Sequence, residues 1–192
     1  MGTDKGLLKK NNLTWAEIAR SKFAALQLPV VISVNSKQVG PYSGVFRQDE
    51  IIVDDESIRV KGPLLGLLSG HYRFPSEDLF VLACDMVDME EKLLKELFAS
   101  FRKGKEEATV FSVDERLQPL CGIYTAKGLS RVNYLLRKQQ LERFSMMYVL
   151  DCLKTNCIPV QGSFIHCFNN YNSSKEQDQS TECLSPSATR KM

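Results

Sequence analysis

Short apolar runs alternate along the chain with segments whose apolar residues recur every three or four positions. The runs are rich in β-branched residues and predict buried strands at residues 30–34, 51–53, 79–84, 108–113, 120–124 and 158–160. The segments with helical spacing predict helices at residues 14–26, 62–72, 88–101, 129–139 and 145–155. Strands that are apolar throughout are typical of a parallel sheet with helices on both faces. The pattern therefore predicts a three-layer α/β protein with a mostly parallel sheet.

Polar residues mark where two of these helices begin. Thr14 and Glu17 have the spacing of a capping box, in which each side chain satisfies a backbone N–H at the start of a helix. Asp88 stands three residues before Glu91 and is the predicted cap of the helix that follows. In folds of this class a strand normally precedes the first helix, but residues 1–13 are too polar to form a buried strand. We therefore expect the first strand of the sheet to be missing from this chain.

Length and composition indicate one folded domain. The 192 residues are enough to bury a sizeable core. Hydrophobic residues make up 43% of the chain and charged residues 25%, and this composition is ordinary for a globular protein. From Lys175 onward the chain is polar, and such a segment cannot bury enough apolar surface to offset the entropy lost on ordering. We predict a folded domain over residues 1–176 and a disordered polar tail over residues 177–192.

Charge and cysteine usage exclude several kinds of partner. The net charge of +2 gives no reason to expect nucleic acid, and no apolar run is long enough to cross a bilayer. Because the N-terminus also lacks the apolar stretch of a signal peptide, we expect a cytoplasmic protein. None of the six cysteines forms a CxxC pair, and His71 and His166 show no ligand-like spacing, so a structural zinc site is not expected.

Several predicted strands end in polar residues, and Asp85 is the most informative of these. In open parallel sheets, ligands bind beyond the carboxyl ends of the strands. Ser33 and Asn35 follow one strand, the pair Asp54 and Asp55 follows another, and Asp85 follows six apolar residues. A carboxylate placed in this way suits Mg²⁺, which takes one or two carboxylates together with phosphate oxygens. The alternative, that Asp85 only caps the following turn, is equally compatible with the spacing.

The other candidate residues each have two interpretations. Lys5 lies in a glycine-rich opening and could bind phosphate as a point charge, or it could be a solvated lysine. The segment 62–66 could present helix N-terminal amides to an anion, or it could simply begin a helix. Arg116 could reach a substrate or lie in a solvated loop between two strands. Asn170 and Asn172 could recognise a heterocycle through their amides, or they could form a turn.

Taken in order, the motifs of this chain resemble those of the molybdenum cofactor guanylyltransferases. The matching segments are residues 1–8 (MGTDKGLL), 32–35 (ISVN), 53–55 (VDD), 62–66 (GPLLG), 84–86 (CDM), 115–120 (ERLQPL) and 168–172 (FNNYN). Each segment is short, but together they span roughly residues 1–176, nearly all of the foldable chain, in the family's order. The resemblance implies a Rossmann-like nucleotidyltransferase fold. It also implies transfer of GMP from GTP to the terminal phosphate of molybdopterin, with release of pyrophosphate.

The resemblance also implies roles for particular residues. Lys5 matches the lysine that contacts the phosphates of GTP, and Asp85 matches the acid that binds Mg²⁺, so these two are the expected catalytic residues. Asp55 matches an acid of the GTP site. Ser33 stands where some members carry an asparagine that contacts guanine, which makes it a further nucleotide-binding residue. The expected cofactor is Mg²⁺, held by Asp85.

On the acceptor side, Asn170 and Asn172 match asparagines near the pterin substrate, and Arg116 lies in a matching segment and is assigned to the same site. The partners implied are GTP and molybdopterin, together with molybdopterin-processing enzymes and apo-molybdoenzymes. Two other functions stay open. One is a non-catalytic homologue that binds pterin or a partner protein, and the other is a sister nucleotidyltransferase that uses another nucleotide.

The start of the chain departs from the family pattern. That pattern has an apolar strand and a glycine-rich loop ahead of the Met-Gly-x-Asp-Lys segment, which here stands at residues 1–5. We therefore expect the first strand and the Gly-Gly loop to be missing from the 192-residue chain. The same departure predicts reduced stability and weak GTP binding.

Overall fold

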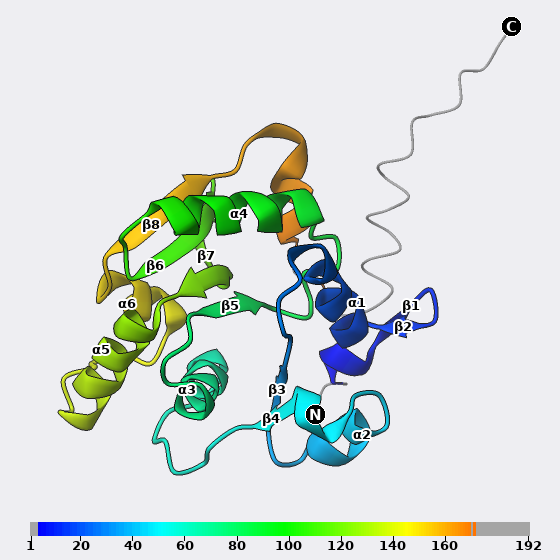
Figure 1. The fold of residues 1–192 in the computed structure, drawn as a ribbon, viewed down its shortest axis with the longest axis horizontal. Helices are drawn as coiled ribbons and strands as arrows, with labels where there is room; N and C mark the ends of the chain where they lie inside the picture. Colours follow the sequence, from blue (N-terminus) through cyan, green and yellow to red (C-terminus); the bar gives the residue numbers. More distant parts are fainter. Residues whose placement is uncertain (1–3, 170, 172–192) are drawn as a thin grey trace, which may run out of the picture.

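The computed structural model describes residues 4–169 and 171. Its main sheet has four strands in the order β5 (Leu79–Leu82), β7 (Arg116–Tyr124), β6 (Ala108–Val113) and β8 (Thr155–Pro159). Strand β7 runs antiparallel to both β5 and β6, whereas β6 and β8 are parallel. Three of the four strands therefore point the same way, and their carboxyl ends meet at one edge of the sheet (Figure 1).

A second, smaller sheet consists of two parallel strands, β3 (Ile32–Val34) and β4 (Ile51–Val53). Helix α3 (Pro63–Arg73) contacts β3, β4 and also β5. One helix thus packs against both sheets, which form no ladder with each other within the described residues. The parallel strands and the helical cover confirm the predicted α/β class. The predicted absence of a first strand stays a prediction.

One face of the main sheet is covered by α3, α5 (Ala126–Arg137) and α6 (Met146–Asp151). The core on this face is built from aliphatic side chains at helical spacing, which pack on the strand residues that point toward them. Its fully buried members include Leu64, Leu68, Val110, Leu129 and Val149. Burial of such side chains contributes about 1.5–3 kcal/mol each, so this core is a principal source of stability.

The opposite face is covered by α4 (Glu91–Lys103) and by the 3₁₀ turn η4 (Gly162–Phe168) (Figure 1). Successive strand residues point to opposite faces, so Val110 of β6 belongs to the first core and Phe111 to the second. The ring of Phe111 meets Phe168 of η4 edge to face, with 5.4 Å between ring centroids. The molecule thus has the predicted three layers, with a core on each side of the sheet.

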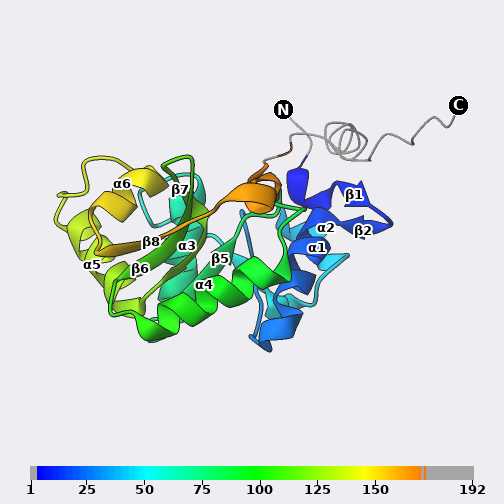
Figure 2. The ribbon, with the colours of Figure 1, turned by 90° about the horizontal axis from the view of Figure 1, so that it is seen from above.

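The N-terminal elements pack as a small lobe at one end of the molecule (Figure 2). They are η1 (Lys5–Leu7), β1 (Lys9–Lys10), β2 (Leu13–Thr14), α1 (Trp15–Lys22) and η2 (Ala24–Leu26). The predicted capping box is confirmed, because the Thr14 side chain accepts a hydrogen bond from the Glu17 backbone and the Glu17 carboxylate accepts one in return. Helix α1 ends before the predicted residue 26, and the chain tightens into η2 instead.

Two elements between β3 and β4 were not apparent from the periodicity. They are helix α2 (Val39–Ser43) and the 3₁₀ turn η3 (Gln48–Glu50). Helix α2 contains Gly40 and Pro41, which are poor helix formers, and it is too short to show a period. Tyr42 nevertheless buries its ring in a small core with residues of α1 and β3.

Two local predictions are wrong. Asp88 does not cap α4, because the helix begins at Glu91 and the Asp88 carboxylate instead accepts hydrogen bonds from two other side chains. Arg116 does not lie in a loop, because β7 begins at that residue. The turn before it consists of Asp114 and Glu115, both with positive φ (47° and 63°). This backbone conformation suits a tight hairpin and lets β7 start earlier than its apolar run.

No helix among the described residues is long and apolar enough to cross a membrane. The predicted tail, residues 177–192, lies outside the described residues, as do Asn170 and Asn172.

Candidate active site

Lys5 and Asp85 meet at the carboxyl edge of the main sheet. The Lys5 ammonium lies 3.0 Å from Asp85 Oδ2, and the side chains keep 38% and 18% of their surface exposed. Lys5 comes from η1 and Asp85 follows β5, so two segments 80 residues apart supply the pair. A cation and an acid held together at the end of a strand can bind a phosphate and a metal ion side by side.

Asp4 holds the turn that carries Lys5. Its Oδ1 accepts hydrogen bonds from the Gly6 backbone N–H and the Tyr42 hydroxyl, each at 3.1 Å. Its Oδ2 accepts one from the Gln38 amide at 2.7 Å. Burial and the neighbouring Asp4 carboxylate raise the pKa of Tyr42, so its hydroxyl remains a donor. These contacts fasten η1 to α2 and fix the backbone from which Lys5 extends.

Cys84 lies directly beside the pair but has different chemistry. Burial raises the pKa of its thiol to about 11, and the carboxylates of Asp85 and Asp4 add to the shift while Lys5 opposes it. The thiol therefore stays protonated at neutral pH and is a poor nucleophile. Cys84 is therefore suited to packing rather than to nucleophilic catalysis.

A second group of polar residues lies where β3 and β4 end. Ser33 Oγ donates a hydrogen bond to Asp54 Oδ1 at 2.9 Å, so the partner of Ser33 is Asp54 rather than Asp55. Burial raises the pKa of Asp54, and the hydrogen bond from Ser33 opposes that shift. The Asp55 backbone N–H donates to Ser69 Oγ at 2.8 Å. Hydrogen bonds to Ser57 lower the pKa of the Asp55 carboxyl, which keeps it ionised as an acceptor.

Gly66 of α3 permits this arrangement. A Cβ atom at that position would lie 2.7 Å from Ser33 Oγ, so a larger residue would displace the serine from its bond with Asp54. Of the two interpretations of the segment 62–66, the structure thus shows the packing role of Gly66 at the start of α3.

Arg116 is the remaining predicted site residue among those that the structure describes. Arg116 is exposed at the first position of β7, beside Val113 at the carboxyl end of β6, and therefore lies on the same edge of the sheet as Asp85. The described residues show Lys5 with Asp85, and Ser33 with Asp54, but no hydrogen bond joins these two groups.

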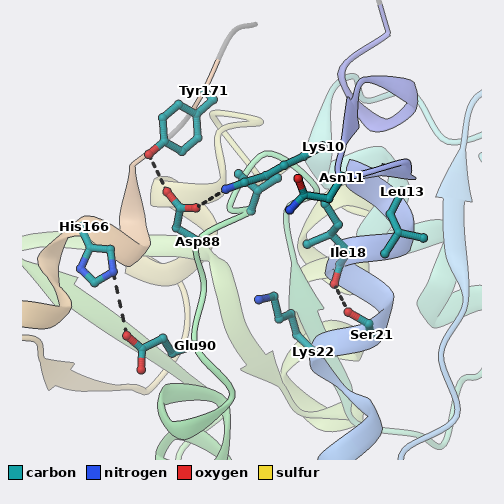
Figure 3. A pocket seen from close by; sticks show the side chains of 11 residues that line it. Lys10, Asn11, Leu13, Ile18, Ser21, Lys22, Asp88, Glu90, His166 and Tyr171 are labelled. Carbon is teal, nitrogen blue, oxygen red and sulfur yellow. Dashed lines mark hydrogen bonds and ion pairs between the residues drawn. The ribbon is translucent and has the colours of Figure 1, made fainter. Parts of the chain in front are cut away.

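A pocket beside Asp88 brings together residues that the sequence reasoning missed (Figure 3). Asp88 Oδ1 accepts a hydrogen bond from Lys10 at 3.1 Å, and Oδ2 accepts one from the Tyr171 hydroxyl at 2.6 Å. The pocket has a volume of about 560 Å³ and is lined by Lys10, Asn11, Leu13, Ile18, Ser21, Lys22, Val87, Asp88, Glu90, His166 and Tyr171. In the sequence, Tyr171 stands between Asn170 and Asn172, the two asparagines predicted for the acceptor site. That position was the sequence signal that pointed to this pocket.

Comparison with known proteins identifies the family. The family of MobA-like NTP transferase domains matches residues 1–150, most of the chain. The chain belongs to this family. A probable molybdenum cofactor guanylyltransferase of Geobacillus sp. (strain WCH70) is 30% identical to it over 141 residues, which cover 72% of this chain and 70% of the relative. The predicted family and the nucleotidyltransferase class are therefore confirmed.

Solved structures place the MobA-like chain in the same fold. Molybdopterin-guanine dinucleotide biosynthesis protein A from Archaeoglobus fulgidus superposes with a TM-score of 0.75 at 18% identity, covering 95% of this chain and 91% of that protein. The 4-diphosphocytidyl-2C-methyl-D-erythritol synthase of Anaerococcus prevotii gives a TM-score of 0.69 at 9% identity, with 95% and 92% covered. At such identities the likeness concerns the fold, and it confirms the predicted nucleotidyltransferase architecture.

Proposed function

We propose that this MobA-like protein transfers GMP from GTP to molybdopterin, which yields the guanine dinucleotide form of the cofactor and pyrophosphate. The ion pair between Lys5 and Asp85 carries the proposal, because it places a phosphate-binding cation and a metal-binding acid together at the carboxyl edge of the sheet. The name of the Geobacillus relative, a probable molybdenum cofactor guanylyltransferase, supports the choice of substrates.

The reaction needs no nucleophile from the protein. A phosphate oxygen of molybdopterin forms a new bond to the α-phosphorus of GTP, and the bond from that phosphorus to the bridging oxygen of the β-phosphate breaks. The leaving group is pyrophosphate, whose negative charge the Lys5 ammonium offsets. Such transfers depend on positioning and on charge neutralisation, which fits a site in which Cys84 is a protonated thiol.

Asp85 is the residue that we propose to hold Mg²⁺. Its carboxylate is a hard oxygen donor that keeps part of its surface exposed, and only one of its two oxygens is bonded to Lys5. When bound, Mg²⁺ would offset charge on the phosphate oxygens of the nucleotide. The contact between Lys5 and Asp85 would then be exchanged for contacts of each residue with the nucleotide phosphates and the metal.

Recognition of guanine is assigned to the group at the ends of β3 and β4. Guanine presents two adjacent N–H donors, which a carboxylate can accept in a bidentate manner. Asp55 suits this role because hydrogen bonds to Ser57 hold its pKa below the ordinary value. Ser33 contributes a hydroxyl that already donates to Asp54 and can turn to a base. Cytosine lacks the paired donors, so this site would favour GTP over CTP.

Molybdopterin is proposed to bind on the C-terminal side of the site. Arg116 offers a guanidinium on the same edge of the sheet as Asp85, and the assignment of Asn170 and Asn172 rests on the family resemblance alone. Molybdopterin-processing enzymes and apo-molybdoenzymes are the proposed protein partners, and the cytoplasm, where GTP is available, is the proposed location.

A comparison of the four nucleotides as substrates tests the proposal. The protein is incubated with molybdopterin and Mg²⁺, and pyrophosphate release is measured with GTP, CTP, ATP or UTP as the nucleotide. We expect release with GTP and little with the others. A preference for CTP would show a sister nucleotidyltransferase. Pterin binding without release from any nucleotide would show a non-catalytic homologue.

A further inference from the structure

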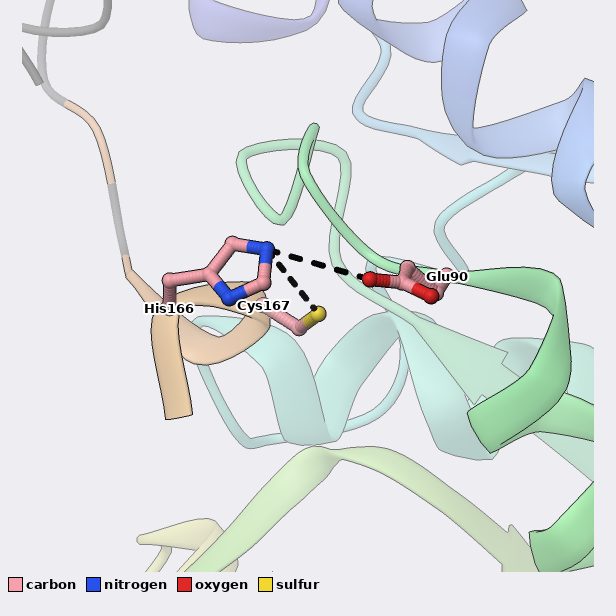
Figure 4. A group of neighbouring side chains, drawn as sticks. All are labelled: Glu90, His166 and Cys167. Atoms are coloured by element: carbon pink, nitrogen blue, oxygen red, sulfur yellow. Dashed lines mark hydrogen bonds and ion pairs between the residues drawn. The ribbon is translucent and has the colours of Figure 1, made fainter. Parts of the chain in front are cut away.

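Three potential metal ligands from two distant segments, Glu90, His166 and Cys167, lie close together (Figure 4). Two of them, Glu90 and His166, line the pocket near Asp88 (Figure 3). The Nε2 atom of His166 lies 3.7 Å from Cys167 Sγ and 3.9 Å from Glu90 Oε1. All three ligand atoms lie within 4.8 Å of one another. A tetrahedral zinc ion with ordinary bond lengths holds nitrogen and sulfur ligands roughly 3.5 Å apart. Small side-chain adjustments would therefore bring all three atoms within bonding distance of one ion.

A second hydrogen bond fixes the orientation of the histidine ring. His166 Nδ1 lies 2.5 Å from the backbone carbonyl oxygen of Ser163. Because a carbonyl can only accept, Nδ1 carries a proton, which leaves Nε2, on the side of Cys167 and Glu90, as the ring atom that can bind an ion. Histidines that bind metal ions usually donate their other N–H to a carbonyl or a carboxylate in this way. This contact is independent of the spacing of the three ligands and points to the same role.

The surroundings of Cys167 suit a metal ligand better than a nucleophile. Its side chain is 1% exposed in the core beneath η4, so a bulky electrophile cannot reach it. Burial raises the pKa of the Cys167 thiol to about 11, and the Glu90 and Asp88 carboxylates add to the shift, whereas a hydrogen bond from the Glu90 backbone N–H and the charge of Lys22 oppose it. Without a metal ion the sulfur therefore keeps its proton. A metal ion that enters from the pocket would form a bond to sulfur, while the S–H bond breaks and its proton passes to solvent.

From these contacts we propose that Glu90, His166 and Cys167 bind a divalent ion of the zinc type, with one coordination position open to the pocket. Sulfur and imidazole nitrogen are ligands that select Zn²⁺ over Mg²⁺. Three protein ligands leave the fourth tetrahedral position for water or another molecule. The side chains of His166 and Glu90 keep 35% and 47% of their surface exposed, so the ion can enter from solvent.

This site is separate from the proposed Mg²⁺ ligand. Asp85 has only oxygen to offer, comes from the end of β5, and pairs with Lys5 rather than with any member of the cluster. The zinc site therefore does not rest on the proposed guanylyl transfer, and its test can be read without a reaction. Sequence spacing concealed it, because Glu90 precedes α4 whereas His166 and Cys167 lie in η4.

Cobalt is a suitable probe, because Co²⁺ substitutes for Zn²⁺ and reports its ligands in its absorption spectrum. The metal-free protein, kept reduced, is titrated with CoCl₂. A tetrahedral site with one thiolate gives visible bands together with a near-ultraviolet sulfur-to-cobalt band. We expect these bands to saturate at one ion per chain and to disappear when Zn²⁺ is added. Binding should also release about one proton from the thiol at neutral pH.

Substitutions at the proposed ligands test which side chains bind the metal ion. Cys167→Ser should abolish the sulfur-to-cobalt band, and His166→Ala should weaken Co²⁺ binding at least tenfold. The matched control is Cys157→Ser, which removes an exposed cysteine of β8 and should leave the spectrum unchanged. If Cys167→Ser fails to fold, as judged by circular dichroism, the partly exposed His166→Ala still decides the matter. The absence of any tetrahedral spectrum in the wild-type protein, or its survival in both ligand variants, would overturn the proposal.

Discussion

At the scale of single residues, the site depends on how Lys5 and Asp85 are held in place. Their ion pair is partly exposed, and such pairs contribute about 0–1 kcal/mol to stability. The pair therefore contributes little to stability. The rigidity of its surroundings has another origin, since Asp4 fastens η1 through three hydrogen bonds while Asp85 follows a paired strand. The surroundings therefore hold the two side chains in positions that suit ligand binding, whereas the ion pair itself adds little to the stability of the fold.

Asp85→Asn tests the metal-binding role. An amide is a poor ligand for Mg²⁺, so turnover should fall by about two orders of magnitude or more while the fold is kept. The melting temperature should change little, because only a weak ion pair is lost. Steady-state pyrophosphate release and a thermal melt check both parts. Asp49→Asn, at an exposed carboxylate of η3, is the control. Near-normal turnover in Asp85→Asn would remove Asp85 from the site.

Gly6→Ala tests the close packing around the turn that carries Lys5. A Cβ at Gly6 would lie 2.0 Å from the Tyr42 hydroxyl oxygen, so Tyr42 must move and lose its bond to Asp4. We expect a loss of about 1–3 kcal/mol in the free energy of unfolding, together with weaker GTP binding. Gly40→Ala is the matched control, since a Cβ at Gly40 meets nothing within 4 Å. Equal stability of the two variants would contradict the packing argument.

At the scale of elements, the sequence predicted what local chemistry determines. The bounds of β4 and β6 were correct because each is a short apolar run that ends in polar residues. Helix α2 and the first half of β7 were missed. One contains glycine and proline, and the other is polar because it extends beyond the sheet core as one arm of the hairpin with β6. Both elements form because of contacts with distant segments, and the local sequence pattern does not reveal such contacts.

The capping box of α1 gives a prediction that depends on pH. Hydrogen bonds to Thr14 lower the pKa of Glu17 from its ordinary value of 4.5. A group whose pKa is depressed on folding contributes stability above its unfolded pKa, and loses it as the pH falls through the folded value. Thr14→Ala should therefore cost about 0.5–2 kcal/mol at pH 7, and less at pH 3, which lies below the ordinary glutamate pKa of 4.5. Urea unfolding of both proteins at the two pH values measures this, and a larger cost at pH 3 would contradict it.

At the scale of the whole molecule, the arrangement of parallel strands brings the functional groups to one edge. Lys5, Asp85 and Arg116 come from separate segments, yet they lie along the carboxyl edge of the main sheet. That Asp85 would lie there could be predicted, because it follows an apolar run. Its pairing with Lys5, and the meeting of Glu90 with His166 and Cys167, could not be derived from periodicity, because each depends on how distant segments pack.

The extent of the folded domain stays a prediction at this scale. The polar composition of residues 177–192 predicts that their removal leaves the melting temperature unchanged within error. A thermal melt of the shortened and full chains, side by side, measures this. A clear loss of stability on shortening would place those residues in contact with the domain.

The most direct test of the account follows two labels through the reaction. The protein is supplied with molybdopterin, Mg²⁺ and GTP that carries radioactive phosphorus either at the α-position or at the γ-position, and the products are separated. Guanylyl transfer predicts that the α-label appears in a molybdopterin-guanine dinucleotide, and the γ-label in pyrophosphate. Appearance of the γ-label in the pterin product, or transfer of neither label by a folded protein, would contradict the central claim.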